Sequence, residues 1–329
     1  MSRCPFLYPE WSRATISAMN QPLTIRERRR REPLPPWFRV RVPSGDRLAT
    51  FQGTSAAVHE NQLNTVCEEA RCPNIHDCWG RGTATFMIGG QSCTRDCAFC
   101  SVTHNRTPPA PDPDEPRGLA DAVGRMGLDY AVITVVNRDD LPDEGAGHYR
   151  QCVDAVHERF PKVGLELLCG DMDGNENALA ALLDGAPLNV FAHNVETVER
   201  LTPNIRDRKA SFSQSLRILE AVRELRPDLV TKSSIMVGLG ESDSDVTNAM
   251  ASLRGVNCDV VTFGQYLSPG PGHYPIVAYP PPEKFEAWKA QAFELGFLGV
   301  ASGPLVRSSF RAGELYAEAI KRREKNGTL

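Results

Sequence analysis

Three of the ten cysteines lie close together, in the stretch CTRDCAFC at residues 93–100. Closely spaced thiolates are typical ligands of zinc and of iron–sulfur clusters. A structural zinc site takes four protein ligands, and bacterial ferredoxin clusters use C-x2-C-x2-C with a further cysteine, so the spacing C-x3-C-x2-C matches neither. Cys93, Cys97 and Cys100 are therefore predicted to hold a four-iron cluster that leaves one iron open to a small molecule.

The alternative for this stretch is a helix on which the three cysteines share one face and pack into the core. Gly89 and Gly90 precede the stretch, no convincing cap begins such a helix, and a core face more often uses Leu or Ile. Metal ligation is the stronger interpretation.

A second cysteine triplet lies upstream, in CEEARCPNIHDC at residues 67–78, with the spacing C-x4-C-x5-C. On a helix, Cys67 and Cys72 would lie about 140° apart at 100° per residue. Pro73 would also interrupt a helix at this point. We therefore expect Cys67, Cys72 and Cys78 to lie in a loop that surrounds a second cluster.

The composition is that of a globular protein, with 329 residues, 41% hydrophobic and 24% charged. A net charge of -4 argues against a nucleic-acid-binding protein, because no basic excess is present to neutralise phosphates. The longest apolar run, at 131–136, is far too short to span a membrane. Ten cysteines in a long chain without a secretory signal indicate a reducing compartment, and we expect the protein to be cytoplasmic.

The first 45 residues are expected to form a basic, Pro-rich arm that contains the run RERRRRE. A solvated arm is the simplest interpretation. An organelle transit peptide, which would place the protein in an organelle matrix, and a docking strip for an acidic partner are the alternatives.

From residue 83 onward, short β-branched runs alternate with amphipathic helical stretches such as 148–160 and 211–226. This alternation predicts βαβ units and a parallel sheet, either doubly wound or curled into a partly open barrel. The expected strands are 83–88, 130–136, 164–169, 188–193, 230–237 and 259–267.

Polar residues cluster directly after several of these strands, where parallel α/β folds carry their sites. Asn137, Arg138 and Asp139 follow one strand, and Asn194 follows another. The first expected strand runs into the stretch 93–100. The three cysteines are therefore expected at the mouth of the barrel.

The pattern C-x3-C-x-Φ-C, with Phe99 as the aromatic residue, resembles the signature of radical S-adenosylmethionine (SAM) enzymes. In that superfamily SAM chelates the open iron and is cleaved to a 5′-deoxyadenosyl radical. The two triplets in this order resemble the lipoyl synthase family, and the resemblance covers most of the chain. It includes GTATFMIGG (82–90), VNRDDL (136–141), HNVETVERL (193–201), TKSSIMVGLGE (231–241), GQYLSP (264–269) and GPLVRSSFRAGE (303–314).

The resemblance implies an α/β fold with a partial (β/α)6 TIM-like barrel at 83–300. It also implies an N-terminal extension that binds the auxiliary cluster at 46–82, and a C-terminal tail at 301–329 that carries a cluster ligand. The implied activity is that of a sulfurtransferase that inserts two sulfur atoms, at C6 and C8 of a protein-bound octanoyl chain. The implied cofactors are SAM and two 4Fe-4S clusters, with the auxiliary cluster as the sulfur donor.

The implied partners are octanoylated lipoyl carrier domains, namely E2 subunits of 2-oxoacid dehydrogenases and the glycine cleavage H protein. A reductant such as ferredoxin or flavodoxin and an iron–sulfur carrier protein are also implied, with no nucleic acid and no membrane. Phe99, Asn137, Arg138, Asp139 and Asn194 are the residues expected to bind SAM.

The family's RSSY stretch reads RSSF here, and the match assigns its ligating serine to Ser309, with Ser308 as the alternative. Ser309 would thus join Cys67, Cys72 and Cys78. The chain departs from the family at Phe310, which replaces a tyrosine, and in PDEGAG, where a second glycine is commoner.

Two other classes of protein remain open from the residues alone. Two clusters would also suit an electron-transfer or cluster-storage protein, although the barrel pattern and the open iron disfavour it. A structural zinc protein is disfavoured by triplets where four ligands are expected. Metal analysis combined with a SAM-cleavage assay discriminates the three.

Overall fold

Eight strands form one sheet in the computed structural model, which describes residues 34–39, 42–61 and 63–327. The arm before residue 34, with Cys4 and the arginine run, lies outside the described residues. In spatial order the strands are β1 (Asn64–Thr65), β2 (Thr85–Ile88), β5 (Tyr130–Val135), β6 (Gly164–Leu168), β7 (Val190–Ala192), β8 (Val230–Val237), β9 (Val260–Gln265) and β10 (Gly299–Gly303).

The sheet is a partial barrel, as expected from the sequence. Strands β2 to β10 pair in parallel, β1 pairs antiparallel with β2, and no pairing joins β10 to β1 among the described residues. The six predicted strands correspond to β2 and β5–β9, and all six are confirmed. Strand β10 was not predicted, because it is rich in glycine and short side chains and so has little β propensity.

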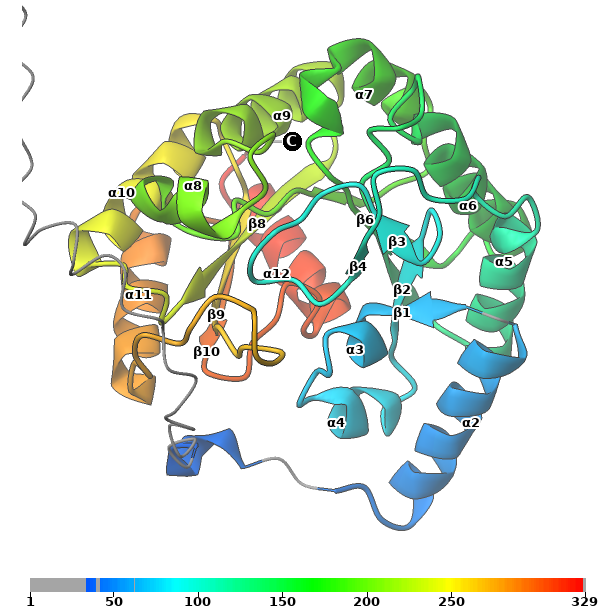
Figure 1. Cartoon of the computed structure of the whole chain (residues 1–329), viewed down its shortest axis with the longest axis horizontal. Coiled ribbons are helices and arrows are strands. Elements are labelled where there is room, and N and C mark those ends of the chain that lie inside the picture. Colours follow the sequence, from blue (N-terminus) through cyan, green and yellow to red (C-terminus); the bar gives the residue numbers. More distant parts are fainter. Residues whose placement is uncertain (1–33, 40–41, 62, 328–329) are drawn as a thin grey trace, which may run out of the picture. The chain divides into compact units, whose positions relative to one another are not determined.

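Helices connect the parallel strands and form a ring outside them (Figure 1). The ring consists of α5 (Glu115–Met126), α6 (Ala146–Arg159), α7 (Glu176–Leu183), α9 (Phe212–Leu225), α10 (Asp243–Gly255) and α11 (Pro282–Glu294). Shorter elements are η1 (Pro36–Phe38), η2 (Met172–Gly174), η3 (Glu199–Leu201) and α8 (Thr202–Ile205). In the described part of the chain, no helix is both long and apolar enough to cross a membrane.

Local sequence signals set where several of these helices begin and end. The Ser211 hydroxyl accepts a hydrogen bond from the backbone of Gln214 and caps α9. Ser242 and Asp245 form a reciprocal capping box at the start of α10. Helix α5 ends at Gly127, whose φ of 59° is left-handed and therefore favours glycine.

The last helix, α12 (Ala312–Lys325), closes the barrel at the end opposite the cysteines. Its Leu315 and Ala319 pack with Val190, Val230 and Val260, which are the first residues of β7, β8 and β9. Because α12 covers the amino-terminal ends of the strands, the carboxyl-terminal ends remain available for a site.

The segment before β2 contributes α2 (Asp46–Glu60) and two short helices, α3 (Val66–Glu69) and α4 (Ile75–Trp79). Trp79 and Val58 are buried in the same core cluster as Phe86 of β2. Antiparallel pairing of Thr65 with Phe86 also fixes the start of α3 beside β2. The upstream cysteines are therefore anchored to the barrel rather than held on a free loop.

Candidate functional site

The cysteine loop at 93–100 follows β2 and lies at the carboxyl-terminal end of the barrel. It is not helical. It begins in the two-residue strand β3 (Ser92–Cys93), which pairs with β4 (Thr103–His104). Backbone N–H groups point at its sulfur atoms. Asn137 and Arg95 donate to Cys93 Sγ at 3.3 and 3.4 Å, and Asp207 donates to Cys97 Sγ at 3.3 Å. Such donors suit thiolates better than thiols, because the hydrogen bond stabilises negative charge.

The thiols of this loop are half-buried and close to one another. Burial raises the pKa of Cys97 to about 12, and the neighbouring Cys100 and Cys93 add to the rise. Burial likewise raises the pKa of Cys100 to about 11, with a further contribution from Cys93. Three mutually interacting sulfur atoms that face backbone donors are a donor set that fits an iron–sulfur cluster.

A buried ion-pair network fixes the backbone of this loop. The guanidinium of Arg95, only 4% exposed, contacts Asp139 at 2.6 Å and Asp171 at 2.9 Å. Burial acts to raise the pKa of Asp139, but hydrogen bonds from Arg95 and Thr94 outweigh it and lower the pKa. The loop between Cys93 and Cys97 is therefore tied to the segments that follow β5 and β6.

The upstream triplet converges in a similar way. Cys67 lies in α3, Cys78 lies in α4, and Cys72 lies between them next to Pro73, so two helices of about one turn replace the expected loop. Pro73 does separate the helices, as expected. Burial raises the pKa of Cys78 to about 12, and Cys67 and Cys72 add to the rise.

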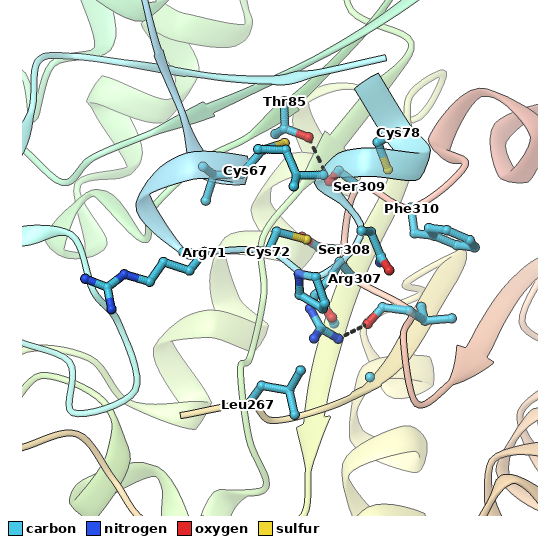
Figure 2. A pocket seen from close by; sticks show the side chains of 18 of the residues that line it. Cys67, Arg71, Cys72, Cys78, Thr85, Leu267, Arg307, Ser308, Ser309 and Phe310 are labelled. Atoms are coloured by element: carbon cyan, nitrogen blue, oxygen red, sulfur yellow. Dashed lines mark hydrogen bonds between the residues drawn. The ribbon is translucent and has the colours of Figure 1, made fainter. Parts of the chain in front are cut away.

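The C-terminal tail reaches this triplet from the other end of the chain. The Asn74 amide donates to the carbonyl of Leu305 at 2.5 Å, and the Thr85 hydroxyl donates to Ser309 Oγ at 2.8 Å. Figure 2 shows Ser309 and the three cysteines of the upstream triplet lining the same cavity.

That cavity has a volume of about 380 Å³ and reaches from the upstream triplet to Cys100 of the loop at 93–100. Cys67, Cys72 and Cys78 line one part of it, and Cys100 lines another. Other parts of its wall come from the ends of β8 and β9 and from the tail at 306–311. A small molecule in this cavity would lie between the two groups of cysteines.

The residues expected to bind SAM fall into two groups. Phe99 and Asn194 line the cavity, and Asn194 Oδ1 is buried without a hydrogen-bond partner in the described residues. Asn137, Arg138 and Asp139 do not line it. Asp139 pairs with Arg95, as described above, and the backbone of Asn137 contacts Cys93.

Arg138 is buried and engaged by protein groups. Its guanidinium contacts Asp140 at 2.8 Å and donates to the carbonyl of Gly89 at 3.0 Å. The Gly89 N–H donates to the Glu115 carboxylate at 2.8 Å. Both the N–H and the carbonyl of Gly89 are therefore hydrogen-bonded. With a φ of 89°, Gly89 makes a turn that favours glycine between β2 and the cysteine loop.

Comparison with known proteins decides the family. The model of the radical SAM superfamily matches residues 87–253. The chain is 50% identical over 298 residues to "Lipoyl synthase, mitochondrial" of Komagataella phaffii, covering 89% of this chain and 70% of the relative. It is also 50% identical to the enzyme of the same name from Eremothecium gossypii, covering 89% of this chain and 79% of the relative.

The chain belongs to the lipoyl synthase family.

Lipoyl synthases are radical SAM enzymes, so this chain is an enzyme of the radical SAM sulfurtransferase type that uses SAM and a 4Fe-4S cluster. Among solved structures, methylornithine synthase is similar in fold, with a TM-score of 0.50 and 15% identity over 77% of this chain and 70% of that one.

The lipoyl synthases named above are mitochondrial, which contradicts in part the expectation of a cytoplasmic protein.

Two charged residues that line the cavity were not predicted from the sequence. Glu196 lines the cavity two residues after Asn194, and its φ of 65° is left-handed. Burial raises the pKa of Glu196, and the carboxyl in turn raises the pKa of Cys100. The signal available was a second polar residue directly after a strand, in HNVE.

Arg307 is the second missed residue. Its Nη1 donates to the carbonyl of Val306 at 2.6 Å, and none of the described carboxylates forms an ion pair with it. Burial lowers the pKa of Arg307, and Cys72 acts in the opposite direction. A guanidinium that lies near Cys72 and has no ion-pair partner among the described carboxylates fits a site that gains negative charge when its thiols ligate a metal.

Proposed function

We propose that this lipoyl synthase inserts two sulfur atoms, at C6 and C8 of an octanoyl chain that is carried on the lysine of a lipoyl carrier domain. The observation that supports the proposal most strongly is that the three cysteines of the upstream triplet and Cys100 of the loop at 93–100 line one cavity. A substrate chain that enters this cavity lies between the two groups of thiols. Its carbon atoms are thereby brought within reach of both.

We assign a 4Fe-4S cluster to Cys93, Cys97 and Cys100, and a second one to Cys67, Cys72, Cys78 and Ser309. When bound, the first cluster and SAM would supply a radical able to break an unactivated C–H bond, and the second cluster would supply sulfur. No acid or base side chain could achieve this cleavage heterolytically. The task of the chain is therefore to position the substrate and the cofactors and to exclude water.

The residues around Cys100 are assigned to SAM. Asn194, with its unpartnered oxygen, and Glu196 offer polar groups, while Phe99 offers an aromatic surface. Asn137, Arg138 and Asp139 would support SAM binding through the loop, since their contacts fix Cys93 and the turn at Gly89.

The division of the chain follows from these assignments. We propose that 46–82 supplies the auxiliary cluster site, 83–300 forms the barrel, and 301–329 supplies Ser309 and the closing helix, with 1–45 as a basic arm. The mitochondrial names of the relatives favour an organelle matrix as the location, where the carrier domains, a reductant and an iron–sulfur carrier protein would be its partners.

Anaerobic reconstitution with iron and sulfide, followed by incubation with SAM, a reductant and an octanoylated carrier-domain peptide, tests the proposal. We expect about eight irons per chain after reconstitution and the formation of 5′-deoxyadenosine from SAM. The mass of the peptide should increase by that of two sulfur atoms, minus that of the hydrogen atoms they replace. A Cys258→Ala variant is the matched control, because Cys258 is buried just before β9, at the amino-terminal end of the strands. Cleavage of SAM without sulfur in the peptide would contradict the proposal.

A further inference from the structure

Thr85 connects the two segments that supply the proposed auxiliary cluster site. It is the first residue of β2 and is only 5% exposed. Burial raises the pKa of the Cys67 thiol, and a hydrogen bond from the backbone of Thr85 acts in the opposite direction. Its hydroxyl donates to Ser309 Oγ at 2.8 Å, across a sequence separation of 224 residues (Figure 2). One residue thus contacts the first and the last ligand of the set.

The position of Thr85 is fixed by the sheet and not by the cysteine segment itself. Thr85 pairs with Val132 of β5, and the residue after it, Phe86, pairs with Thr65 at the start of α3. A side chain that projects from a paired strand, and that carries a β-branched Cβ, has little freedom at χ1. Thr85 is therefore a rigid support, whereas Ser309 lies in a turn of the tail.

The direction of the hydrogen bond defines what Ser309 can do. A hydroxyl has one proton and two acceptor lone pairs. Because the Thr85 proton is donated to Ser309 Oγ, one lone pair of Ser309 is used, and the other lone pair and its own proton face elsewhere. A donated hydrogen bond also favours a serine oxygen that has given up its proton to bind a metal.

The same bond distinguishes the two adjacent serines. Both Ser308 and Ser309 line the cavity. Among the described residues, a hydrogen bond from Thr85 reaches Ser309, and no side-chain bond is formed by Ser308. The hydroxyl of Thr85 therefore selects between two otherwise similar oxygens.

We propose that Thr85 is a positioning residue that selects Ser309 as the fourth ligand and holds it beside Cys67. The proposal rests on the proposed auxiliary cluster site. Thr85 is not itself a proposed ligand of the cluster; it acts through Ser309 and Cys67.

The test uses Thr85→Val, which keeps the shape and the backbone N–H but loses the hydroxyl, and Thr85→Ser, which keeps the hydroxyl. Both are made in a full-length chain whose Cys93, Cys97 and Cys100 are alanine, so that only the auxiliary site loads. The proteins are reconstituted anaerobically with 57Fe and sulfide. Mössbauer spectra report whether one iron differs from the other three, and a chelator reports the rate of iron loss.

We expect Thr85→Val to lose the distinct iron signal and to release iron about tenfold faster, the effect of one well-placed hydrogen bond. Thr85→Ser should retain the distinct signal. Ser309→Ala should reproduce the Thr85→Val spectrum, and combining the two changes should add nothing, because both remove the same interaction. Thr134→Val controls for the loss of a buried threonine hydroxyl on the neighbouring strand β5.

The outcomes separate this proposal from the proposed function. If Thr85→Val matches the parent protein while Ser309→Ala differs, Ser309 is a ligand and the role of Thr85 is refuted. If Ser309→Ala also matches the parent, the fourth ligand lies elsewhere and both assignments to these residues are wrong. If Cys67→Ala leaves the iron content unchanged, the auxiliary site itself is misassigned. Thr85→Ala, which removes the hydroxyl without adding a methyl group, serves the same comparison should Thr85→Val not fold.

Discussion

Gly264 of β9 lies directly against the carbonyl of Val306 in the tail. A Cβ built on Gly264 would be 2.1 Å from that oxygen, closer than any real contact. Because the obstacle is backbone, no side-chain rotation could relieve it. The missing side chain at Gly264 is therefore what allows the tail to approach the end of the barrel and bring Ser309 to the cysteines.

Gly264→Ala should displace the tail and lower the free energy of unfolding by about 1–3 kcal/mol, the usual effect of overpacking. The loss of Ser309 from the site should also reduce lipoyl product while SAM cleavage persists. Thermal unfolding and the two activity assays measure these effects. Gly255→Ala is the control, since nothing lies within 4 Å of a Cβ at the end of α10. Equal effects of both changes would contradict the interpretation.

Cys97→Ala should abolish the formation of 5′-deoxyadenosine from SAM. Removing one of three thiolates leaves the cluster without a full ligand set, and the N–H of Asp207 then faces no sulfur. Chromatography of the reaction mixture detects the product. Cys258→Ala should cleave SAM normally, and undiminished cleavage by Cys97→Ala would remove the assignment of this loop.

Replacing Cys67, Cys72 and Cys78 together with alanine should eliminate sulfur insertion but leave SAM cleavage measurable. The two triplets lie on separate segments, so the loop at 93–100 should load by itself. The iron content should fall by about half, in keeping with the loss of one of two four-iron clusters. Lipoyl product from this triple variant would show that the sulfur comes from another source.

Ser309→Cys should assemble the auxiliary cluster yet turn over poorly. Thiolate is a softer and stronger ligand for these clusters than a serine oxygen, so the fourth iron would be held more tightly. Iron content and product yield measure the two effects separately. Ser308→Cys is the matched control; damage from that variant alone would move the ligand role from Ser309 to Ser308.

Glu144 should make the stability depend on pH. Burial, with Asp139 and Asp173 nearby, raises the pKa of Glu144 to about 7 from 4.5, and one oxygen has no partner among the described residues. The folded state therefore binds more protons than the unfolded state between about pH 4.5 and 7, so stability falls as pH rises through this window.

Glu144→Gln should be more stable than the parent protein at pH 8, with the difference lost near pH 4.5. Melting temperatures of the two proteins at several pH values measure this. Glu283→Gln, at an exposed position, controls for the change in net charge. A difference that is constant with pH, or that grows toward low pH, would contradict the assigned shift.

The sequence by itself determined the features that depend on short-range patterns. The spacing of Cys93, Cys97 and Cys100 predicted a cluster-binding loop, and the alternation of strands and helices predicted the parallel sheet and the end of it at which the loop lies. These patterns can be recognised in the sequence because a ligand spacing or a strand period extends over only a few consecutive residues.

Only the tertiary structure decided which polar residues face the cavity. Arg138 and Asp139 follow a strand as a site residue would, yet their charges are compensated by Asp140 and Arg95. The sequence could not reveal this, because each partner is chosen by how the loops pack. The contact of Thr85 with Ser309 joins residues 224 positions apart. It exists because the curling of the sheet brings β2, near one edge, close to the tail that follows β10 at the other edge, and no local sequence pattern encodes that approach.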